Sequence, residues 1–336
     1  MRILHVTNMY PTAARPAFGI FVQRQVEALH RLGISQSLYL IPEGSARRYV
    51  HAAEEVRARV RREHYDLVHA HYGLSAWAAM WQSRPLVATF AGSDLYGHSD
   101  GRGGQTWRGR WEVLLANWAA QRADRVVVMT ERMIQLLSSG AARCRCVVLP
   151  YGIPVRDFHP GSREAARQRL GLPLDQFVVL WPHSANPTKR RDIAVMAIDK
   201  LRDAVPDAVL WEPVVTPDKM EHCYRAADCL LVASDTEGSP NVVREALCAA
   251  LPVVSVDVGD VWSLIDRVAW CRRAERDPND IAQRLADVAR TPRPTEAPNF
   301  VWEFDCERVA IKLIAIYEAI LRDRQTTRWA SKAATS

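Results

Sequence analysis

The sequence predicts an α/β protein made of two doubly wound, Rossmann-like domains that face a central cleft. Three observations predict this fold class. The chain has 336 residues, more than one ordinary hydrophobic core uses and enough for two domains. Short apolar runs alternate with amphipathic stretches along the whole chain. The alternation restarts once, after a segment rich in proline and glycine at residues 150–161.

The first half contains six near-continuous apolar runs, the pattern of strands that are buried on both faces of a parallel sheet. They are Ile3–Thr7, Ser37–Ile41, Leu67–His71, Leu86–Phe90, Arg125–Met129 and Cys146–Leu149. Four amphipathic stretches predict the helices between them: Phe21–Leu32, Ala46–Arg62, Trp107–Arg122 and Glu131–Ser138. Strands joined by helices of this length form parallel β-α-β units.

The second half repeats the pattern. The expected strands are Val178–Trp181, Val209–Trp211, Cys229–Ala233, Val253–Val256 and Ala269–Cys271. The expected helices are Arg191–Arg202, Lys219–Ala226, Val242–Ala249, Ile281–Ala289 and Glu307–Arg322. We therefore expect domains at 1–155 and 156–305, a C-terminal helix at 306–324 that packs back toward the first domain, and a disordered tail at 325–336.

Composition narrows the class of protein. No apolar run approaches the roughly 20 residues that a membrane span needs, and the N-terminus becomes polar too soon for a signal peptide. The seven cysteines form no metal-ligand pattern, and we expect a cytoplasmic protein with reduced thiols. No Gly-x-Gly-x-x-Gly or P-loop motif is present, which weakens the dehydrogenase and NTPase interpretations.

Positive charge is concentrated in the first half. Residues 1–160 contain 20 arginines, no lysine and 12 acidic residues, a net charge of +8. Such a surface suits an anionic partner such as phosphate groups or a membrane, and an ordinary solvated face explains it equally well. No nucleic-acid-binding motif is found, so we expect no nucleic acid partner.

The stretch from Ser234 to Ala246 is the most informative in the chain. It follows a buried strand and begins a helix, with Ser239 suited to the N-cap and Pro240 to the first helical position. The N–H groups of a helix start, together with the helix dipole, form an anion site. Glu237 and Glu245 bracket that site. Since carboxylates repel phosphate, we expect both to accept hydrogen bonds from hydroxyl groups, one from a sugar and one from a ribose.

This stretch, followed by Leu251-Pro-Val-Val, resembles the paired-glutamate motif of retaining nucleotide-sugar glycosyltransferases of family 4, which have the GT-B fold. Weaker motifs occur in the family's order over nearly the whole chain. They are Asn8-Met-Tyr-Pro11 with Gly19-Ile-Phe-Val22, His69-Ala-His-Tyr-Gly73, Gly92-Ser-Asp94, Ala123-Asp124 and Pro150-Tyr-Gly152. The members that these motifs resemble include bacterial cell-surface polysaccharide glycosyltransferases.

The resemblance implies roles for individual residues. Glu237 would bind the transferred sugar, Glu245 the ribose, and Lys189 the leaving diphosphate, with help from Arg190. The diphosphate would also be held by the backbone of Gly238, Ser239, Pro240, Asn241 and Val242, with Gly19 on the donor side. His69, His71 and Asp94 would lie on the acceptor side of the cleft, although a lone histidine near a strand end is more often structural.

Three positions depart from the family pattern. A Gly-Arg pair common in relatives is replaced by Pro182-His183-Ser184-Ala185. Ala91 stands where many members have an active-site histidine, and Tyr151 stands where asparagine is common. These changes concern acceptor handling and rate more than the fold.

The resemblance implies a mechanism without an enzyme nucleophile. The acceptor hydroxyl would attack on the face of the leaving group, and the leaving phosphate would take its proton. No Asp-x-Asp motif is present, so we expect no metal and no cofactor, with Lys189 and the helix dipole supplying positive charge. The donor would be a UDP- or GDP-sugar, and the acceptor a saccharide or lipid-linked molecule of the cell envelope.

Two alternatives remain open at this point. A nucleotide-sugar epimerase on the same fold would consume the donor without an acceptor. A degenerate subunit would bind the nucleotide sugar without turnover. The tryptophans of Trp107-Arg-Gly-Arg-Trp111 and Trp118 share one helix face, which would either pack in the core or contact an anionic membrane surface.

Overall fold

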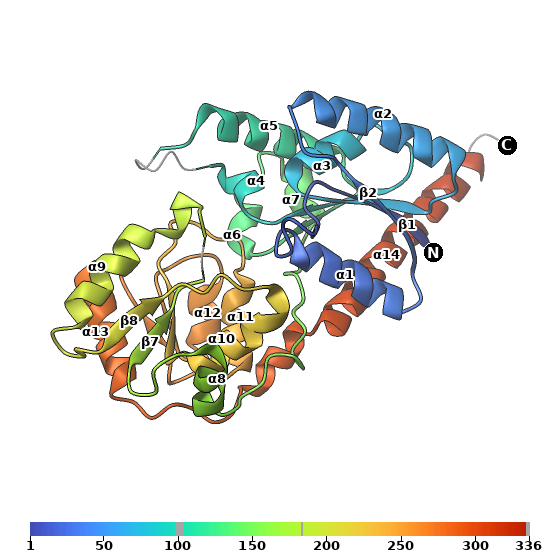
Figure 1. Ribbon diagram of the computed structural model, residues 1–336. Helices are drawn as coiled ribbons and strands as arrows, with labels where there is room; N and C mark the ends of the chain where they lie inside the picture. The colour runs from blue at the N-terminus through green and yellow to red at the C-terminus, as the bar shows by residue number, and fades with distance from the viewer. Residues whose placement is uncertain (99–103, 183, 334–336) are drawn as a thin grey trace. The chain divides into compact units, whose positions relative to one another are not determined.

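The computed structural model describes residues 1–98, 104–182 and 184–333, with side chains up to residue 326. These residues form two compact units, each built on its own parallel sheet and hydrophobic core (Figure 1). Unit 1 contains residues 1–98, 104–152 and 306–333, and unit 2 contains residues 153–305. The expected α/β class with two doubly wound sheets is confirmed.

The sheet of unit 1 has the strand order β2-β1-β3-β4-β5-β6, and every pairing is parallel. Its strands are β1 (Arg2–Thr7), β2 (Ser35–Leu40), β3 (Leu67–His71), β4 (Leu86–Phe90), β5 (Arg125–Val128) and β6 (Cys146–Val148). The central strands β3 and β4 are buried at every residue, whereas the edge strand β2 is partly exposed. This difference follows the sequence, because β2 alternates polar and apolar residues and the central strands are nearly continuous apolar runs.

Helices cover both faces of this sheet. They are α1 (Ile20–Arg31), α2 (Arg47–Arg62), α3 (Gly73–Ala79), α4 (Ser93–Tyr96), α5 (Trp107–Arg122), α6 (Glu131–Ile134), α7 (Gly140–Cys144) and α14 (Cys306–Ala333). On one face α3 packs against α2 and α5, and on the other α1 packs against α14 (Figure 1).

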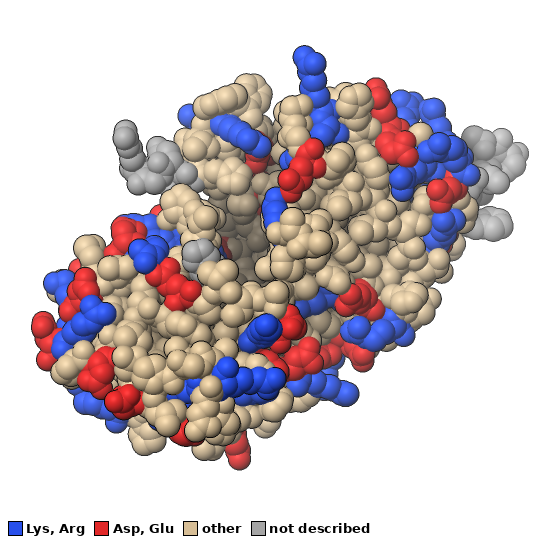
Figure 2. Space-filling view, viewed as in Figure 1, with Lys and Arg blue, Asp and Glu red and all other residues tan. Residues whose placement is uncertain are grey.

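Part of the positive charge of unit 1 lies on the solvated side of α2. This helix buries Tyr49, Ala52, Val56 and Val60, which recur at the spacing of one helix face. Its remaining positions carry many arginines, which gather over its C-terminal part in Figure 2. A solvated helix face therefore accounts for part of the basic charge in the first half of the chain.

The C-terminal helix α14 belongs to unit 1 although it follows unit 2 in the chain. It buries an apolar stripe against the unit 1 core: Val309, Ala310, Leu313, Tyr317 and Ile320. The expected disordered tail from residue 325 is wrong as far as Ala333, because the helix continues to that residue. Arg322 lies near Glu318 one turn earlier, and Arg324 donates to Asp124, so polar contacts extend the helix beyond its apolar stripe.

Unit 2 is a five-stranded parallel sheet with the order β11-β10-β9-β7-β8. Its strands are β7 (Phe177–Leu180), β8 (Ala208–Trp211), β9 (Cys229–Val232), β10 (Val253–Ser255) and β11 (Arg272–Arg273). Its helices are α8 (Arg163–Leu170), α9 (Arg191–Leu201), α10 (Met220–Ala226), α11 (Asn241–Cys248), α12 (Val261–Ile265) and α13 (Pro278–Ala289). Three short 3₁₀ helices complete the unit: η1 (Pro187–Lys189), η2 (Pro217–Lys219) and η3 (Asn299–Phe304).

Several elements of the described structure differ from the sequence prediction. The last strand lies at Arg272–Arg273 rather than 269–271, where the N–H of Cys271 forms a turn with the carbonyl of Val268. Helix α6 ends at Ile134 instead of Ser138, because the next residues form tighter i to i−3 bonds. Five short helices were not predicted: α3, α4, α7, α8 and α12. Helix α3 is short and buried nearly throughout, so it has no amphipathic period to detect.

Both sheets reverse direction at the same place in their topology. In unit 1 the first strand, β1, lies between β2 and β3, and in unit 2 β7 lies between β8 and β9. Ligands of open α/β sheets bind outside the carboxyl ends of strands at such a switch point. A binding site in unit 2 is therefore expected at the loops after β7 and β9.

Candidate functional site

Lys189 and Glu237 meet at the switch point of unit 2. Lys189 ends η1, which follows β7, and Glu237 lies in the loop after β9. The Lys189 ammonium donates to a carboxylate oxygen of Glu237 at 2.5 Å, and the N–H of Asp235 donates to the carbonyl of Thr188 at 2.8 Å. The two loops are thus joined by a charge pair and by a backbone bond. The side chains of Lys189 and Glu237 are 33% and 14% exposed, so both can reach a ligand.

The Glu237 carboxylate is oriented by a second donor. The hydroxyl of Ser234 donates to the same Glu237 oxygen, Oε1, at 2.7 Å. A carboxylate held by two donors keeps a fixed direction and retains further acceptor capacity on its oxygens. This geometry suits the recognition of hydroxyl groups, as the sequence suggested.

The start of helix α11 offers hydrogen-bond donors beside this pair. The first two N–H groups of the helix, on Asn241 and Val242, find no acceptor among the residues that the structure describes. The N–H groups of Gly238 and Ser239 likewise have no partner in the described parts of the chain. Pro240 has no N–H, so the expected backbone site consists of the other four residues. Together with the helix dipole, these donors favour an anion.

The expected cap of α11 is wrong by one residue. The helix begins at Asn241, its N-cap is Pro240, and no side chain among the described residues caps it. Ser239 instead donates to both carboxylate oxygens of Asp260, at 2.9 and 2.8 Å. As a cap, the Ser239 hydroxyl would accept a hydrogen bond from a backbone N–H. Here it donates to the Asp260 carboxylate, which is a strong acceptor and draws the side chain away from the helix start.

Glu245 lies buried within α11. Tyr224 of α10, also buried, donates its hydroxyl to Glu245 Oε2 at 2.7 Å. This bond fixes one oxygen of the carboxylate. Tyr224 was not predicted from the sequence, because it lies 21 positions from Glu245 on another helix.

Arg190 binds the carboxylates of Asp192 and Asp235, and in the described structure it makes no hydrogen bond to Glu237. Its guanidinium donates to Asp192 and to Asp235 at 3.0 Å or less, and these bonds raise the pKa of Arg190 above its ordinary value. Arg276, which the sequence prediction missed, donates to the carbonyl of Ser234 at 2.9 Å. Arg191 pairs with Glu212. His183, one of the residues at the departure from the Gly-Arg pattern, lies outside the described residues.

Gly19 in unit 1 is required by packing. Its φ is +75°, and a Cβ placed on it would lie 2.4 Å from the carbonyl carbon of Met9. Glycine alone allows the start of α1 to approach the loop after β1 this closely. The role of Gly19 toward a donor stays a prediction.

Asp94 is buried at the start of α4. Its carboxylate accepts the N–H groups of Ala91 and Gly92 at 3.1 and 2.9 Å. Burial raises the pKa of Asp94 to about 6, against the opposite effect of these backbone donors. Its visible function in unit 1 is to fix the turn after β4.

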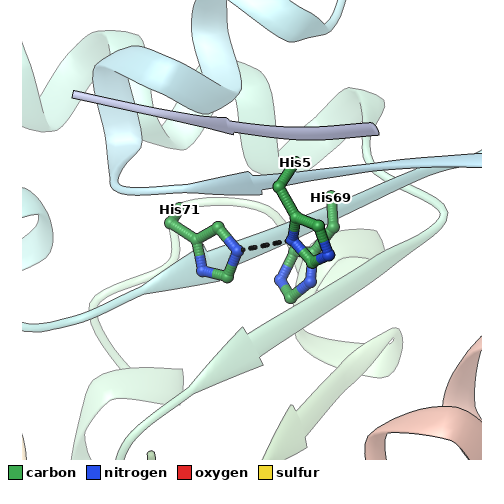
Figure 3. A group of neighbouring side chains, drawn as sticks. All are labelled: His5, His69 and His71. Carbon is green, nitrogen blue, oxygen red and sulfur yellow. Dashed lines mark hydrogen bonds between the residues drawn. The ribbon is translucent and has the colours of Figure 1, made fainter. Parts of the chain in front are cut away.

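Three histidines form a buried cluster beneath α14 (Figure 3). His5 is on β1, and His69 and His71 are on the neighbouring strand β3, all completely buried. His5 Nδ1 lies 3.1 Å from His71 Nε2. Burial lowers the pKa of His5 to about 4 and keeps the pKa of the other two well below the ordinary range, so all three are neutral near pH 7.

Most ring nitrogens of the cluster are already used for hydrogen bonds, although His5 Nε2 has no partner among the described residues. His69 contacts the hydroxyls of Tyr317 and Thr89 at 2.6 and 2.7 Å, and His71 contacts Tyr151 at 3.0 Å. The three rings are near enough to one another to hold a metal ion. However, a metal would have to replace a hydrogen bond on His69 and on His71. We interpret the cluster as a polar network that joins β1, β3 and α14, and this placement gives no support to an acceptor-side role.

A second polar group at the sheet of unit 1 was not anticipated. Glu112 of α5 accepts hydrogen bonds from His98, Arg108 and Tyr72, at 2.9, 2.9 and 3.1 Å. The bond to Glu112 raises the pKa of His98. Tyr72 directly follows β3 and has a φ of +81°. His98 is half exposed and follows α4. It is therefore a polar side chain near the carboxyl ends of the strands, the end at which open α/β sheets generally bind ligands.

Comparisons with known proteins agree with this geometry. The model of glycosyltransferase family 4 matches residues 13–157, and that of glycosyl transferases group 1 matches residues 186–291. A D-inositol 3-phosphate glycosyltransferase of Acidothermus cellulolyticus is 30% identical over 335 residues, covering 82% of this chain and 72% of that protein. The putative teichuronic acid biosynthesis glycosyltransferase TuaC of Bacillus subtilis is 26% identical, with coverage of 80% and 84%.

Solved structures show the same fold. Sucrose-phosphate synthase of Thermosynechococcus elongatus matches with a TM-score of 0.78 at 17% identity, covering 96% of this chain and 99% of that one. Anabaena HepE in complex with UDP-glucose matches with a TM-score of 0.68 at 15% identity, covering 97% and 100%. A UDP-GlcNAc 2-epimerase of Methanocaldococcus jannaschii matches with a TM-score of 0.59 at 13% identity, covering 95% and 100%.

The two half-chain matches and the two-sheet fold define a GT-B glycosyltransferase. This chain belongs to glycosyltransferase family 4. In the described part of the chain, no helix is both long and apolar enough to span a bilayer.

Proposed function

We propose that this protein is a retaining glycosyltransferase that moves a sugar from a nucleoside diphosphate sugar to a saccharide or lipid-linked acceptor of the cell envelope. The observation that carries the proposal is the contact between Lys189 and Glu237 beside the open start of α11. It combines a cation, a hydroxyl acceptor and free backbone donors at one switch point.

Each part of this site matches one part of such a donor. The N–H groups of residues 238, 239, 241 and 242 would hold the diphosphate, and Lys189 would stabilise the charge that develops on it as the sugar leaves. Glu237 would accept hydroxyls of the sugar, and Glu245, held by Tyr224, would accept those of the ribose. HepE, which has the same fold, is described with UDP-glucose, and this supports a nucleotide-sugar donor here.

The site needs no metal in this proposal. Positive charge comes from Lys189 and from the helix start, and the leaving phosphate accepts the proton of the attacking hydroxyl. Activity should therefore persist in the presence of a chelator. A fall in activity that added magnesium restores would contradict this part of the proposal.

The acceptor is proposed to be presented at an anionic membrane, which the protein contacts through helix α5. The face of α5 formed by Trp107, Trp111, Leu114 and Trp118 is exposed, at 76%, 59%, 59% and 40%. Trp107 and Trp111 are therefore not core residues, whereas Trp118 also packs edge-on against Trp81. Amphipathic indole rings suit the headgroup region, and Arg108 and Arg110 on the same helix would attract anionic lipid.

A donor panel tests the proposed function. The purified chain is incubated with UDP- and GDP-sugars, with and without membrane extract, and both nucleotide release and the sugar products are measured. Release that depends on the extract supports transfer to an envelope acceptor. Conversion of the sugar without an acceptor would identify an epimerase, whose fold this chain also shares. Binding without any product would indicate a subunit that lacks turnover.

A further inference from the structure

A buried ion pair lies behind the proposed donor loop. Arg244 of α11 is completely buried, and its guanidinium donates to Asp260 Oδ2 at 2.6 Å. Asp260 directly precedes α12 and follows β10. The pair therefore joins helix α11, which follows β9, to the loop after the neighbouring strand β10. The ring of Phe304 covers the guanidinium at 4.6 Å. Placing a charge out of water is costly unless it is paired, and Asp260 supplies the opposite charge to the buried guanidinium.

Ser239 connects this ion pair to the donor loop. Its hydroxyl donates to Asp260 and accepts from the guanidinium of Arg244. The side chain is therefore used on the side of the ion pair. The group of Ser239 that can bind an anion at the start of α11 is therefore its backbone N–H.

The backbone of the two loops also meets closely at this point. Gly259, next to Asp260, has a φ of +54°, and a Cβ on it would lie 2.4 Å from the carbonyl oxygen of Gly238. The loop after β10 thus supports the donor loop directly behind the peptide that follows Glu237. A shift of Asp260 would move Gly238 and Ser239 with it.

We propose that Arg244 is a positioning residue for the donor: through Asp260 and Ser239 it fixes the direction of the backbone N–H groups that bind the diphosphate. Because Arg244 and Asp260 neutralise one another, the effect on the donor is one of geometry rather than of net charge. Arg244 lies between the two glutamates of the motif but contacts neither in the described structure. This inference rests on the proposed function.

A double-mutant cycle tests the proposal. Ser239→Ala, Arg244→Lys and the double variant are compared with the wild type for nucleoside diphosphate affinity by calorimetry and for donor KM and kcat. Lysine keeps the charge but lacks the planar fork of donors through which Arg244 contacts Ser239 and Asp260. Arg284→Lys, on the half-exposed surface of α13, is the matched control and should behave as wild type.

We expect each single variant to weaken diphosphate binding about tenfold, and the double variant to be no weaker than the worse single one, because both disturb one network. If the loss of diphosphate affinity in the double variant equals the product of the two single losses, the proposal is overturned, since Ser239 and Arg244 then act separately. Unchanged affinity in both single variants would also overturn it.

Two further controls separate this result from other failures. A variant that merely unfolds in part lowers the active fraction without changing donor KM, so a raised KM distinguishes positioning from lost stability. Should Arg244→Lys not fold, Ser239→Ala against Asp260→Asn completes the same cycle. If the wild type binds no nucleoside diphosphate or nucleotide sugar, the proposed function itself fails and the inference fails with it. If the wild type binds and the variants bind equally, the inference alone fails.

Discussion

The two units share a topology and a local motif but use their polar residues differently. In both, an Ala-Asp pair precedes a strand, and the aspartate bonds to the start of the adjacent strand. Asp124 accepts the N–H of Leu86 at 2.8 Å, and Asp228 accepts the N–H of Val178 at 2.7 Å. An arginine completes each site, Arg324 in unit 1 and Arg167 in unit 2. The motif is a structural device that fixes strand register in either sheet.

The contrast lies at the switch points. In unit 1, the equivalent strands β1 and β3 hold His5, His69 and His71 within the strands, where they are fully buried and neutral. In unit 2, Lys189 and Glu237 lie in the loops beyond the strands, carry charge and remain partly exposed. Polar residues inside a strand have to satisfy one another, whereas those in the loop beyond it can serve a ligand. Four predictions test this contrast.

The largest effect is expected at Lys189. Lys189→Ala should lower kcat about a hundredfold or more while changing donor affinity less, because negative charge on the leaving diphosphate grows in the transition state. Steady-state kinetics with the donor found in the panel measures this. Lys200→Ala, at an exposed position of α9, should leave kcat unchanged. A variant that keeps its turnover would transfer the role to another cation, with Arg276 and Arg191 the next to test.

The histidine cluster should make unit 1 sensitive to acid. Burial lowers the pKa of His5 from 6.5 to about 4, so its contribution to stability is complete above about pH 6.5 and is lost as the pH falls through about 4. The shift corresponds to about 3 kcal/mol for His5, and His69 and His71 act in the same direction.

Asp94 opposes this effect. Its pKa is raised to about 6, so its contribution is complete below about pH 4 and is lost as the pH rises through 6. Denaturant unfolding at about pH 7 and about pH 5 should show a net loss of stability in acid. Asp94→Asn should steepen this loss and His5→Gln should reduce it, whereas His51→Gln, at an exposed position of α2, should not alter it. A pH-independent free energy of unfolding would contradict the prediction.

A smaller effect is expected at Glu245. Glu245→Ala removes a hydrogen bond to a ribose hydroxyl in a buried position and should weaken donor binding by about 1 to 3 kcal/mol. Calorimetry with the nucleoside diphosphate measures the loss, and Glu303→Ala, a half-exposed control in the same unit, should show none. Equal affinities for the wild type and Glu245→Ala would rule out the ribose assignment.

The smallest effect concerns helix α5. Each arginine near an anionic surface contributes roughly 1 kcal/mol, so Arg108→Ser with Arg110→Ser should reduce sedimentation with anionic vesicles. Arg169→Ser with Arg290→Ser removes the same charge from exposed positions of unit 2 and is the control. Binding should also weaken at high salt, because the Debye length falls from about 10 Å at 0.1 M to about 3 Å at 1 M. Equal recovery with neutral and anionic vesicles would contradict a membrane role.

The sequence by itself determined the fold class, most strands and the residues of the donor motif. It could do so because buried parallel strands are continuous apolar runs and because a helix start after a strand is a local arrangement. Lys189 and Glu237 were identified separately, and the structure shows that they form a pair. The shortened helix α6 and the shifted β11 were missed, since the ends of elements depend on local backbone hydrogen bonds that the apolar pattern does not show.

Only the tertiary structure decided which side chains form hydrogen bonds with one another. Tyr224 on Glu245, Asp260 on Arg244 and Tyr317 on His69 each come from a distant part of the chain. It also decided that the tryptophans of α5 are exposed, which their spacing left open. Periodicity shows which residues share a face, but burial depends on what packs against that face. A hydrogen bond between residues far apart in sequence leaves no periodic trace at all.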